Sequence, residues 1–325
     1  MIFDVARHKF SEGLITLMFF ALVSLIAALS ATDFVVVEGG APLRSVIDLY
    51  AANHPVASAL LMFPMLMYAG LRFARVAVRV GFYSASSLGL LALAGVSMFA
   101  CTTSNSYASL MVVVLLISEL FGRLLYCFGS EMRLSYLFTA LLSAGIMPLV
   151  DSTLIPAALA LPLVVIVMRG TIREAIVVLV GVSLPTFVYC YLMWLYGGEF
   201  SAAFVDVWSL ENVGVDTPAL LSYLTMPRLV FLGLTLLLGV CSLISYFNSS
   251  INLADSARVI WRLLISLFVI LVAISLLLPV ASPVVVVFLT LLVTLMLPQL
   301  FIRIGVLFAT ITYLIWVVSA LATLF

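Results

Sequence analysis

The sequence predicts an all-α fold, a polytopic bundle of about eleven transmembrane helices that forms one integral membrane domain over residues 1–325. Two observations lead to this prediction. First, 66% of the 325 residues are hydrophobic and only 9% are charged, whereas soluble domains average roughly 45–50% and 25%. Second, apolar runs of about 17 to 25 residues, long enough to cross a hydrocarbon core, alternate with short clusters of Arg, Asp, Asn, Gly and Pro.

The apolar runs define the predicted helices. Arg7 and Lys9 precede the first run, which ends Ala28-Leu29-Ser30-Ala31 and is therefore similar to a secretory signal. We interpret this run as a first membrane helix that is retained. The predicted spans are 13–32, 55–71, 82–101, 108–127, 134–149, 153–168, 175–196, 228–247, 262–279, 283–301 and 304–325.

The basic residues predict the orientation of the bundle, because cytoplasmic loops of membrane proteins carry most of the Arg and Lys. If the N-terminus is cytoplasmic and the spans alternate in direction, only two of the 14 basic residues lie outside, namely Arg44 and Arg228. The C-terminus is then outside. We expect a multi-pass protein of the bacterial inner (cytoplasmic) membrane. Its outer side collects carboxylates, namely Asp33, Glu38, Asp48, Asp151, Glu199, Asp206, Glu211 and Asp216.

Two predicted outer loops, residues 33–54 and 197–227, are long enough to be more than turns. In the first, Gly39-Gly40 is followed by Pro42, which introduces apolar residues at helical spacing. This stretch is expected to lie along the outer membrane surface. The second loop mixes four acids with aromatic and aliphatic side chains, a composition suited to the membrane interface. In the stretch that follows Pro42 in the first loop, the apolar residues at helical spacing are Leu43, Val46, Ile47 and Tyr50.

Composition and motifs exclude several classes of function. A net charge of zero provides no overall field to attract nucleic acid. The chain has no Gly-rich phosphate loop, no dinucleotide fingerprint and no His-Glu-x-x-His, and it contains a single Lys and two His. We therefore expect no cofactor, no metal and no ATP hydrolysis. The four cysteines, interpreted as small core residues, are Cys101, Cys127, Cys190 and Cys241.

The predicted hairpin at 134–168 is short and broken. Only 35 residues lie between Arg133 and Arg169, so each leg is near 24 Å, less than a hydrocarbon core of about 30 Å. Pro148 and Pro156 flank Asp151, which is expected below the outer surface. There it either binds a cation, a proton or a sugar hydroxyl, or caps the N-terminus of the sixth helix. A spanning hairpin and a re-entrant pair both fit, and both return the chain to the cytoplasm.

Charged residues near the first outer loop form a candidate catalytic group. Asp33 follows the first predicted helix, Glu38 comes five residues later, and His54 precedes Pro55 at the second helix. Asp33 or Glu38 is predicted to act as a general base, with Arg44 or Arg228 holding a lipid-linked phosphate and His54 near the substrate. The alternative is that these are solvated loop charges with no shared task.

A second charged group lies near the predicted inner face. Glu119 and Arg123 are four residues apart on the fourth helix, a spacing that allows an ion pair and reduces the cost of burying each charge. We expect a structural ion pair, with a proton relay as the alternative. Arg72, Arg75 and Arg79 recur at helical spacing where the second helix meets the cytoplasm, a pattern typical of topology anchors.

One segment carries a family resemblance. From Leu142 to Phe200 a Gly- and Pro-broken hairpin is followed by Arg169-Gly-Thr-Ile-Arg173-Glu174, then by Gly181-Val-Ser-Leu-Pro185 before a Tyr-rich helix. This order of features resembles an uncharacterised family of bacterial polytopic inner-membrane proteins, a domain of unknown function. The resemblance implies a location in the inner membrane and implies no activity.

A second resemblance rests on the acids that follow the first helix. With Asp33 or Glu38 in that position, the chain resembles the GT-C membrane glycosyltransferases. The resemblance implies a polyprenyl-phosphate-linked sugar as substrate and one of these acids as essential. The chain departs from the GT-C pattern in two respects. Its first outer loop has only about 22 residues, and its eleventh helix stands where those enzymes have a large C-terminal outer domain.

Three functions fit these observations. The first is handling of a lipid-linked or cell-envelope substrate at the extracytoplasmic face, in the manner of a GT-C glycosyltransferase, with Asp151 in the cavity and Arg228 on the phosphate. The second is a transporter or flippase that uses Asp151 in the broken helices. The third is a non-catalytic membrane subunit of a complex. The expected partners are membrane lipid, a polyprenyl-phosphate-linked sugar and other membrane proteins.

Overall fold

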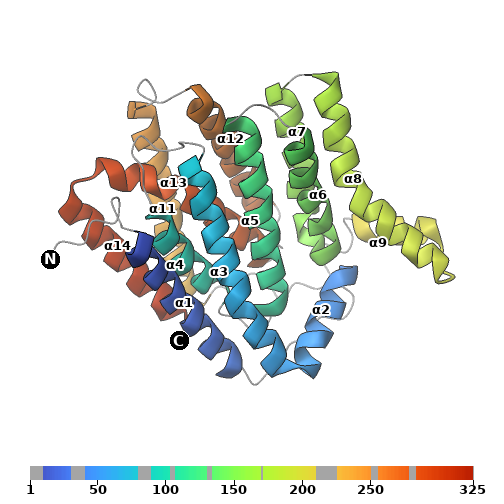
Figure 1. The fold of residues 1–325 in the computed structure, drawn as a ribbon, viewed down its shortest axis with the longest axis horizontal. Coiled ribbons are helices and arrows are strands. Elements are labelled where there is room, and N and C mark those ends of the chain that lie inside the picture. Colours follow the sequence, from blue (N-terminus) through green and yellow to red (C-terminus); the bar gives the residue numbers. More distant parts are fainter. Residues whose placement is uncertain are drawn as a thin grey trace.

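The fold is known from a computed structural model of the 325-residue chain. The structure describes residues 10–30, 41–79, 89–102, 107–129, 134–169, 171–209, 225–249, 255–277 and 283–324. All regular elements in these ranges are helical, which confirms the predicted all-α class. Figure 1 shows that most of the long helices run side by side as a bundle, with α8 and α9 extending from one side of it.

The described residues form thirteen α-helices and two short 3-10 helices. Each of the eleven apolar runs predicted from the sequence coincides with one of them, the sixth with η2 and α7 together. The helices are α1 (Phe10–Ser30), α2 (Pro42–Asn53), α3 (Pro55–Arg79), α4 (Leu90–Thr102), α5 (Tyr107–Gly129), α6 (Leu134–Val150), η2 (Ser152–Leu154), α7 (Ile155–Arg169), α8 (Ile172–Leu195), α9 (Phe200–Trp208), α11 (Met226–Ser249), α12 (Asp255–Leu277), α13 (Pro283–Arg303), α14 (Val306–Leu321) and η5 (Ala322–Leu324).

Eight of the described helices are long and apolar enough to cross a membrane, as in a multi-pass membrane protein. Three other apolar helices are shorter, at Leu90–Thr102, Leu134–Val150 and Ser152–Met168. The last two are the legs of the predicted short hairpin. Helix α4 has 13 residues, about 20 Å at 1.5 Å per residue. Residues 82–88, the start of the predicted third span, lie outside the described ranges.

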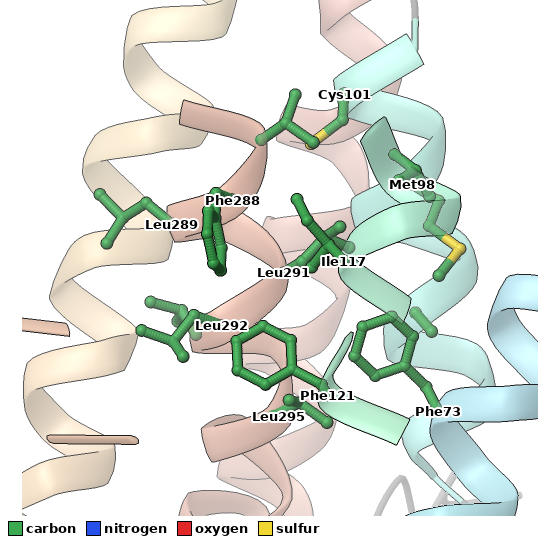
Figure 2. Close-up of a cluster of buried hydrophobic side chains, with 14 of the residues drawn as sticks. Phe73, Met98, Cys101, Ile117, Phe121, Phe288, Leu289, Leu291, Leu292 and Leu295 are labelled. Carbon is green, nitrogen blue, oxygen red and sulfur yellow. The ribbon is translucent and has the colours of Figure 1, made fainter. Parts of the chain in front are cut away.

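Two helices form the centre of the bundle. Every residue of α4 is buried, and so is every residue of α13 from Val284 to Phe301. A helix that is apolar on all sides belongs in a protein core or in a membrane, and here other helices surround both. Figure 2 shows the packing of these two helices against α3 and α5, where the rings of Phe121 and Phe288 meet edge to face at 5.7 Å.

Serine and threonine side chains link the central helices. The hydroxyls of Ser97 on α4 and Thr294 on α13 lie 2.5 Å apart. On the other side of α13, Ser242 of α11 donates to the carbonyl of Met296. Such hydrogen bonds hold helices together where hydrocarbon cannot supply a hydrophobic driving force between them.

The crossing of α6 and α8 depends on glycine. A Cβ atom at Gly145 of α6 would lie 2.2 Å from the carbonyl oxygen of Val182 on α8. A Cβ atom at Gly181 would lie 3.0 Å from the carbonyl oxygen of Phe138. Only a residue without a side chain allows the two backbones to approach this closely. These are two of the glycines that punctuate the segment from Leu142 to Phe200.

Substitution of Gly145 by Ala should therefore separate α6 from α8. We expect Gly145→Ala to lower the free energy of unfolding by about 2 kcal/mol, because the new methyl group meets backbone rather than a movable side chain. Thermal unfolding in mild detergent measures the effect. Gly233→Ala on α11 is the matched control, since nothing lies within 4 Å of its Cβ position. An equal loss of stability in both variants would contradict the prediction.

Candidate functional site

Helix α2 begins and ends at prolines. Pro42 occupies its first turn, where no backbone N–H is needed. The helix ends at His54, whose N–H donates to the carbonyl of Tyr50, and Pro55 starts α3. The predicted helical stretch after Pro42 is thus confirmed. In Figure 1, α2 lies at one end of the bundle, where it contacts α3, α5 and α6. We refer to this as the α2 end.

The amphipathic character of α2 is opposite to that of a surface helix on a soluble protein. Its charged residues point toward the bundle, because Asp48 is buried and Arg44 is only 12% exposed. Its apolar residues Val46 and Tyr50 are instead exposed. A helix that turns polar groups inward and apolar groups outward suits contact with lipid.

Arg44 forms an ion pair with Asp151, the residue at which the hairpin breaks. The Nη1 atom of Arg44 lies 2.9 Å from Oδ2 of Asp151, and the two side chains are 12% and 2% exposed. The pair joins segments that are 107 residues apart in the sequence. Two buried charges that would each be costly alone are therefore compensated by one another.

Asp151 also caps the turn that follows it. Its Oδ1 atom accepts a hydrogen bond of 2.9 Å from the N–H of Thr153, and a second from the hydroxyl of the same residue. The capping interpretation is confirmed, with the 3-10 turn η2 as the first element capped. The prolines do not themselves make the break. Pro148 lies inside α6, which continues to Val150, and Pro156 is in the first turn of α7.

Asp48 is a third buried charge beside this pair. Its Oδ2 atom lies 3.6 Å from Nε of Arg44, and the side chain is 5% exposed. A side-chain hydrogen bond joins it to Ser109 of α5. Burial raises the pKa of Asp48 above its ordinary value, and the positive charge of Arg44 opposes that rise. One guanidinium therefore serves two carboxylates at the α2 end.

The other predicted site residues lie elsewhere. His54 is exposed at the end of α2, with its ring 5.1 Å from that of Tyr50. Arg228 is half-buried at the start of α11 and acts electrostatically on Cys101 of α4. Asp33 and Glu38 are outside the described residues. Of the six candidates, the structure brings together Arg44 and Asp151.

An apolar cavity of about 330 Å³ lies beside α2, between α3 and α5. Two hydroxyls of its lining, those of Ser58 and Tyr107, lie 2.5 Å apart and bond to each other. The surface that remains for a ligand is almost entirely apolar. The lining residues are Val46, Ile47, Tyr50, Ser58, Leu61, Met62, Met65, Tyr107, Ala108, Met111 and Val112.

A second cavity, of about 550 Å³, continues from the first away from α2. The two cavities share Met65 and Val112 in their linings, so they lie next to one another along α3 and α5, and we refer to the two together as the groove. The second cavity changes character along its length. It begins among apolar residues and ends at Glu119 and Arg123. Tyr68 and Ser143 add hydroxyl groups to its wall.

The predicted pair between Glu119 and Arg123 is confirmed and belongs to a larger network. Nε of Arg123 lies 2.7 Å from Oε2 of Glu119. Nε of Arg72 approaches Oε1 at 3.5 Å, and the hydroxyl of Tyr68 donates to the same oxygen. Tyr68 and Arg72 both belong to α3 and lie four residues apart, so they share one face of that helix. This spacing is the sequence signal that could have indicated that both residues join the network.

The described residues contain no group of three or more His, Cys, Asp or Glu side chains that could hold a metal ion. The chain matches no protein-family model, no curated protein and no solved structure in the comparisons made with each. Both family resemblances therefore stay predictions. What the arrangement offers chemically is a groove for an apolar chain with a charged cluster near each end.

Asp151 and Asp48 should respond differently to removal of their charge. Asp151→Asn breaks the pair with Arg44 and should lower the free energy of unfolding by about 3 kcal/mol. Asp48→Asn removes a carboxylate whose ionised form burial already penalises, so we expect a change within about 0.5 kcal/mol at neutral pH. Thermal unfolding of both variants in detergent tests this, and equal losses would contradict it.

The sign of the pH effect follows from the raised pKa of Asp48. Protonation of this group favours the folded state. Its contribution to stability is therefore full below the unfolded-state pKa and is lost as pH rises through the folded-state pKa. The melting temperature of Asp48→Asn should fall less than that of the parent protein as pH is raised through this window.

Proposed function

We propose that this protein binds a lipid-linked cell-envelope substrate and handles it at the extracytoplasmic face of the bacterial inner membrane, with the apolar chain of the lipid in the groove along α3 and α5. The observation that carries the proposal is that the two cavities are neighbours, with Met65 and Val112 in both linings. A site of this kind suits an elongated amphiphile, because it offers an apolar channel with polar groups at its ends.

The proposal includes a topology of about eleven crossings with the N-terminus inside and the C-terminus outside. It is supported by the position of basic residues. Arg75 and Arg303, at the ends of α3 and α13, then lie on the cytoplasmic side. In this orientation the α2 end is extracytoplasmic, and the outward-facing apolar residues of α2 meet the outer leaflet.

The walls of the groove favour a lipid chain over a soluble ligand. Leu61, Val46 and Tyr50 line the first cavity and are also about half exposed, so the groove opens sideways where hydrocarbon surrounds the bundle. A soluble polar ligand would find few hydrogen-bonding partners there and would lose its hydration. A lipid chain can enter laterally without that cost.

The length of the groove favours a long chain. Ala108 and Arg123, at its two ends, are separated by about 22 Å along α5 at 1.5 Å per residue. One leaflet of a bilayer has a hydrocarbon thickness of about 15 Å. A groove that exceeds one leaflet fits the polyprenyl chain of a polyprenyl-phosphate-linked sugar better than an ordinary acyl chain.

In this proposal Asp33 or Glu38 is the general base on the acceptor, and Arg228 holds phosphate at the outer face. Asp151 acts as a positioning residue. It fixes α2 through Arg44, and α2 directly follows the segment that contains Asp33 and Glu38. A coupling-ion role is less suited to Asp151, because Arg44 already supplies its counter-charge.

A second candidate function is lipid translocation. It is favoured by the far end of the groove, where Glu119 and Arg123 place charged groups against an otherwise apolar passage. Charged residues at membrane depth usually mark the path of a polar group.

Filling the first cavity should reduce lipid binding. Ala108→Trp adds a large ring to the wall and should lower the amount of lipid that co-purifies in mild detergent by about tenfold. Native mass spectrometry measures the retained lipid. Leu60→Trp, at a 55% exposed position of α3 outside the lining, is the matched control. Equal lipid retention in both variants would sink the groove as the binding site.

The proposed chemistry predicts a separate effect at the first outer loop. Asp33→Asn or Glu38→Gln, whichever removes the base, should lower envelope glycan formation by about a hundredfold or more, while lipid retention is unchanged. Glu199→Gln, at an exposed acid beside α9, serves as the control. Full glycan formation in both single variants and in the double variant would rule out either acid as the base.

A further inference from the structure

The cluster at the far end of the groove has an excess of positive charge. Within the described residues it contains two guanidinium groups, Arg72 and Arg123, and one carboxylate, Glu119. All three are partly buried, with side chains 27%, 33% and 17% exposed. An ion pair that served only to neutralise buried charge would need one arginine rather than two.

Both arginines contact Glu119 through Nε. Each arginine also carries two terminal Nη groups. These groups form the fork that binds a phosphate or carboxylate through two parallel hydrogen bonds. Arg123 lines the second cavity directly, so its fork is available to a molecule in the groove.

Gly122 provides the room that makes this arrangement possible. A Cβ atom at this position would lie 2.9 Å from Nε of Arg72 and 3.2 Å from its Cγ. The side chain of Arg72 therefore lies against the bare backbone of α5 where it approaches Glu119. Because Glu119 carries one negative charge and the two arginines carry two positive charges, one positive charge of the cluster remains for a ligand.

We propose that Arg123 binds a phosphate-bearing anion at this end of the groove, with Arg72 as a positioning residue that shares Glu119 with Arg123. The inference rests on the proposed function, because it takes the anion to be the headgroup of a lipid whose chain lies in the groove. Lipid headgroup phosphate and free phosphate share this chemistry. The position of the charged cavity next to the apolar one favours the lipid.

The depth of the site fits a headgroup. Arg123 is six residues before Gly129, the last residue of α5, or about 9 Å from that end at 1.5 Å per residue. Arg75, one turn from Arg72 on α3, is exposed and does not line the second cavity. A lipid of the nearer leaflet would bring its phosphate to Arg123 while its chain extends toward Met65, Val112 and the apolar cavity.

The test compares two lipids with identical chains. Purified full-length protein is equilibrated with dioleoyl phosphatidic acid, with dioleoylglycerol, which lacks the phosphate, or with inorganic phosphate alone, and binding is followed by native mass spectrometry. We expect phosphatidic acid to be retained about tenfold better than dioleoylglycerol, and inorganic phosphate to be neither bound nor able to displace it at equal concentration.

The three binding measurements distinguish failure of the proposed function from failure of the phosphate site. Loss of both lipids would overturn the proposed function together with the inference. Equal retention of both lipids would overturn the phosphate site and leave the groove for the chain. Tight binding of inorganic phosphate by itself would show that the site takes free phosphate, and would overturn the assignment to a lipid headgroup.

Variants of the cluster give a second readout. Arg123→Gln should abolish the preference for phosphatidic acid, and Arg75→Gln, which removes an exposed charge of the same sign on α3, should leave most of it. Gly122→Ala keeps every charge but displaces Arg72, and should reduce the preference about threefold. An Arg75→Gln effect as large as that of Arg123→Gln would indicate surface attraction only.

Removal of the competing carboxylate gives a change in the opposite direction. Glu119→Gln frees both arginines and should raise the preference for phosphatidic acid about threefold or more. A purely structural network would instead lose stability without any gain in anion binding. A Glu119→Gln protein that folds and shows no gain would therefore overturn the proposal, even if Arg123→Gln fails to fold.

Discussion

The ion pair between Arg44 and Asp151 fixes how the α2 end of the bundle is built. A charge removed from water is costly unless an opposite charge and hydrogen bonds replace its hydration. Arg44 comes from a helix on the edge of the bundle, and Asp151 comes from a break between two short helices. Neither could be buried alone. Their contact therefore fixes α2 against α6, and with it the wall of the first cavity, since α2 contributes Val46, Ile47 and Tyr50 to that wall.

The same constraint explains why different helices make different kinds of polar contact. The central helices α4 and α13 are buried along their lengths and use short hydroxyl side chains for their polar contacts. Four ion pairs lie on the side formed by α2, α3, α5 and the break after α6, where the groove lies. That side of the described bundle combines cavities with compensated charge. A binding site on this side can therefore change its polar groups without disturbing the central packing shown in Figure 2.

The sequence predicted the helices well because the signal for a membrane helix is long and local. Every apolar run corresponds to a helix, and the amphipathic stretch after Pro42 and the pair between Glu119 and Arg123 depend on residues four or fewer positions apart. The contact between Arg44 and Asp151 was not predicted, because 107 residues separate them and no local rule selects the partner. A weaker signal existed. Each was a lone charge expected near the outer face, and two such charges in one bundle are natural counterions.

The two charged clusters differ in net charge, and this difference bears on the direction of a bound lipid. At the α2 end one arginine serves two carboxylates, Asp48 and Asp151, so no positive charge is left over there. At the far end two arginines share Glu119, which leaves an excess of positive charge. A phosphate is therefore drawn toward Arg123 rather than toward α2. A lipid held in this way has its headgroup about 22 Å from the α2 end along α5. Chemistry at the outer face then requires the headgroup to travel along the groove, and for that reason the charge distribution favours translocation as a part of the proposed function.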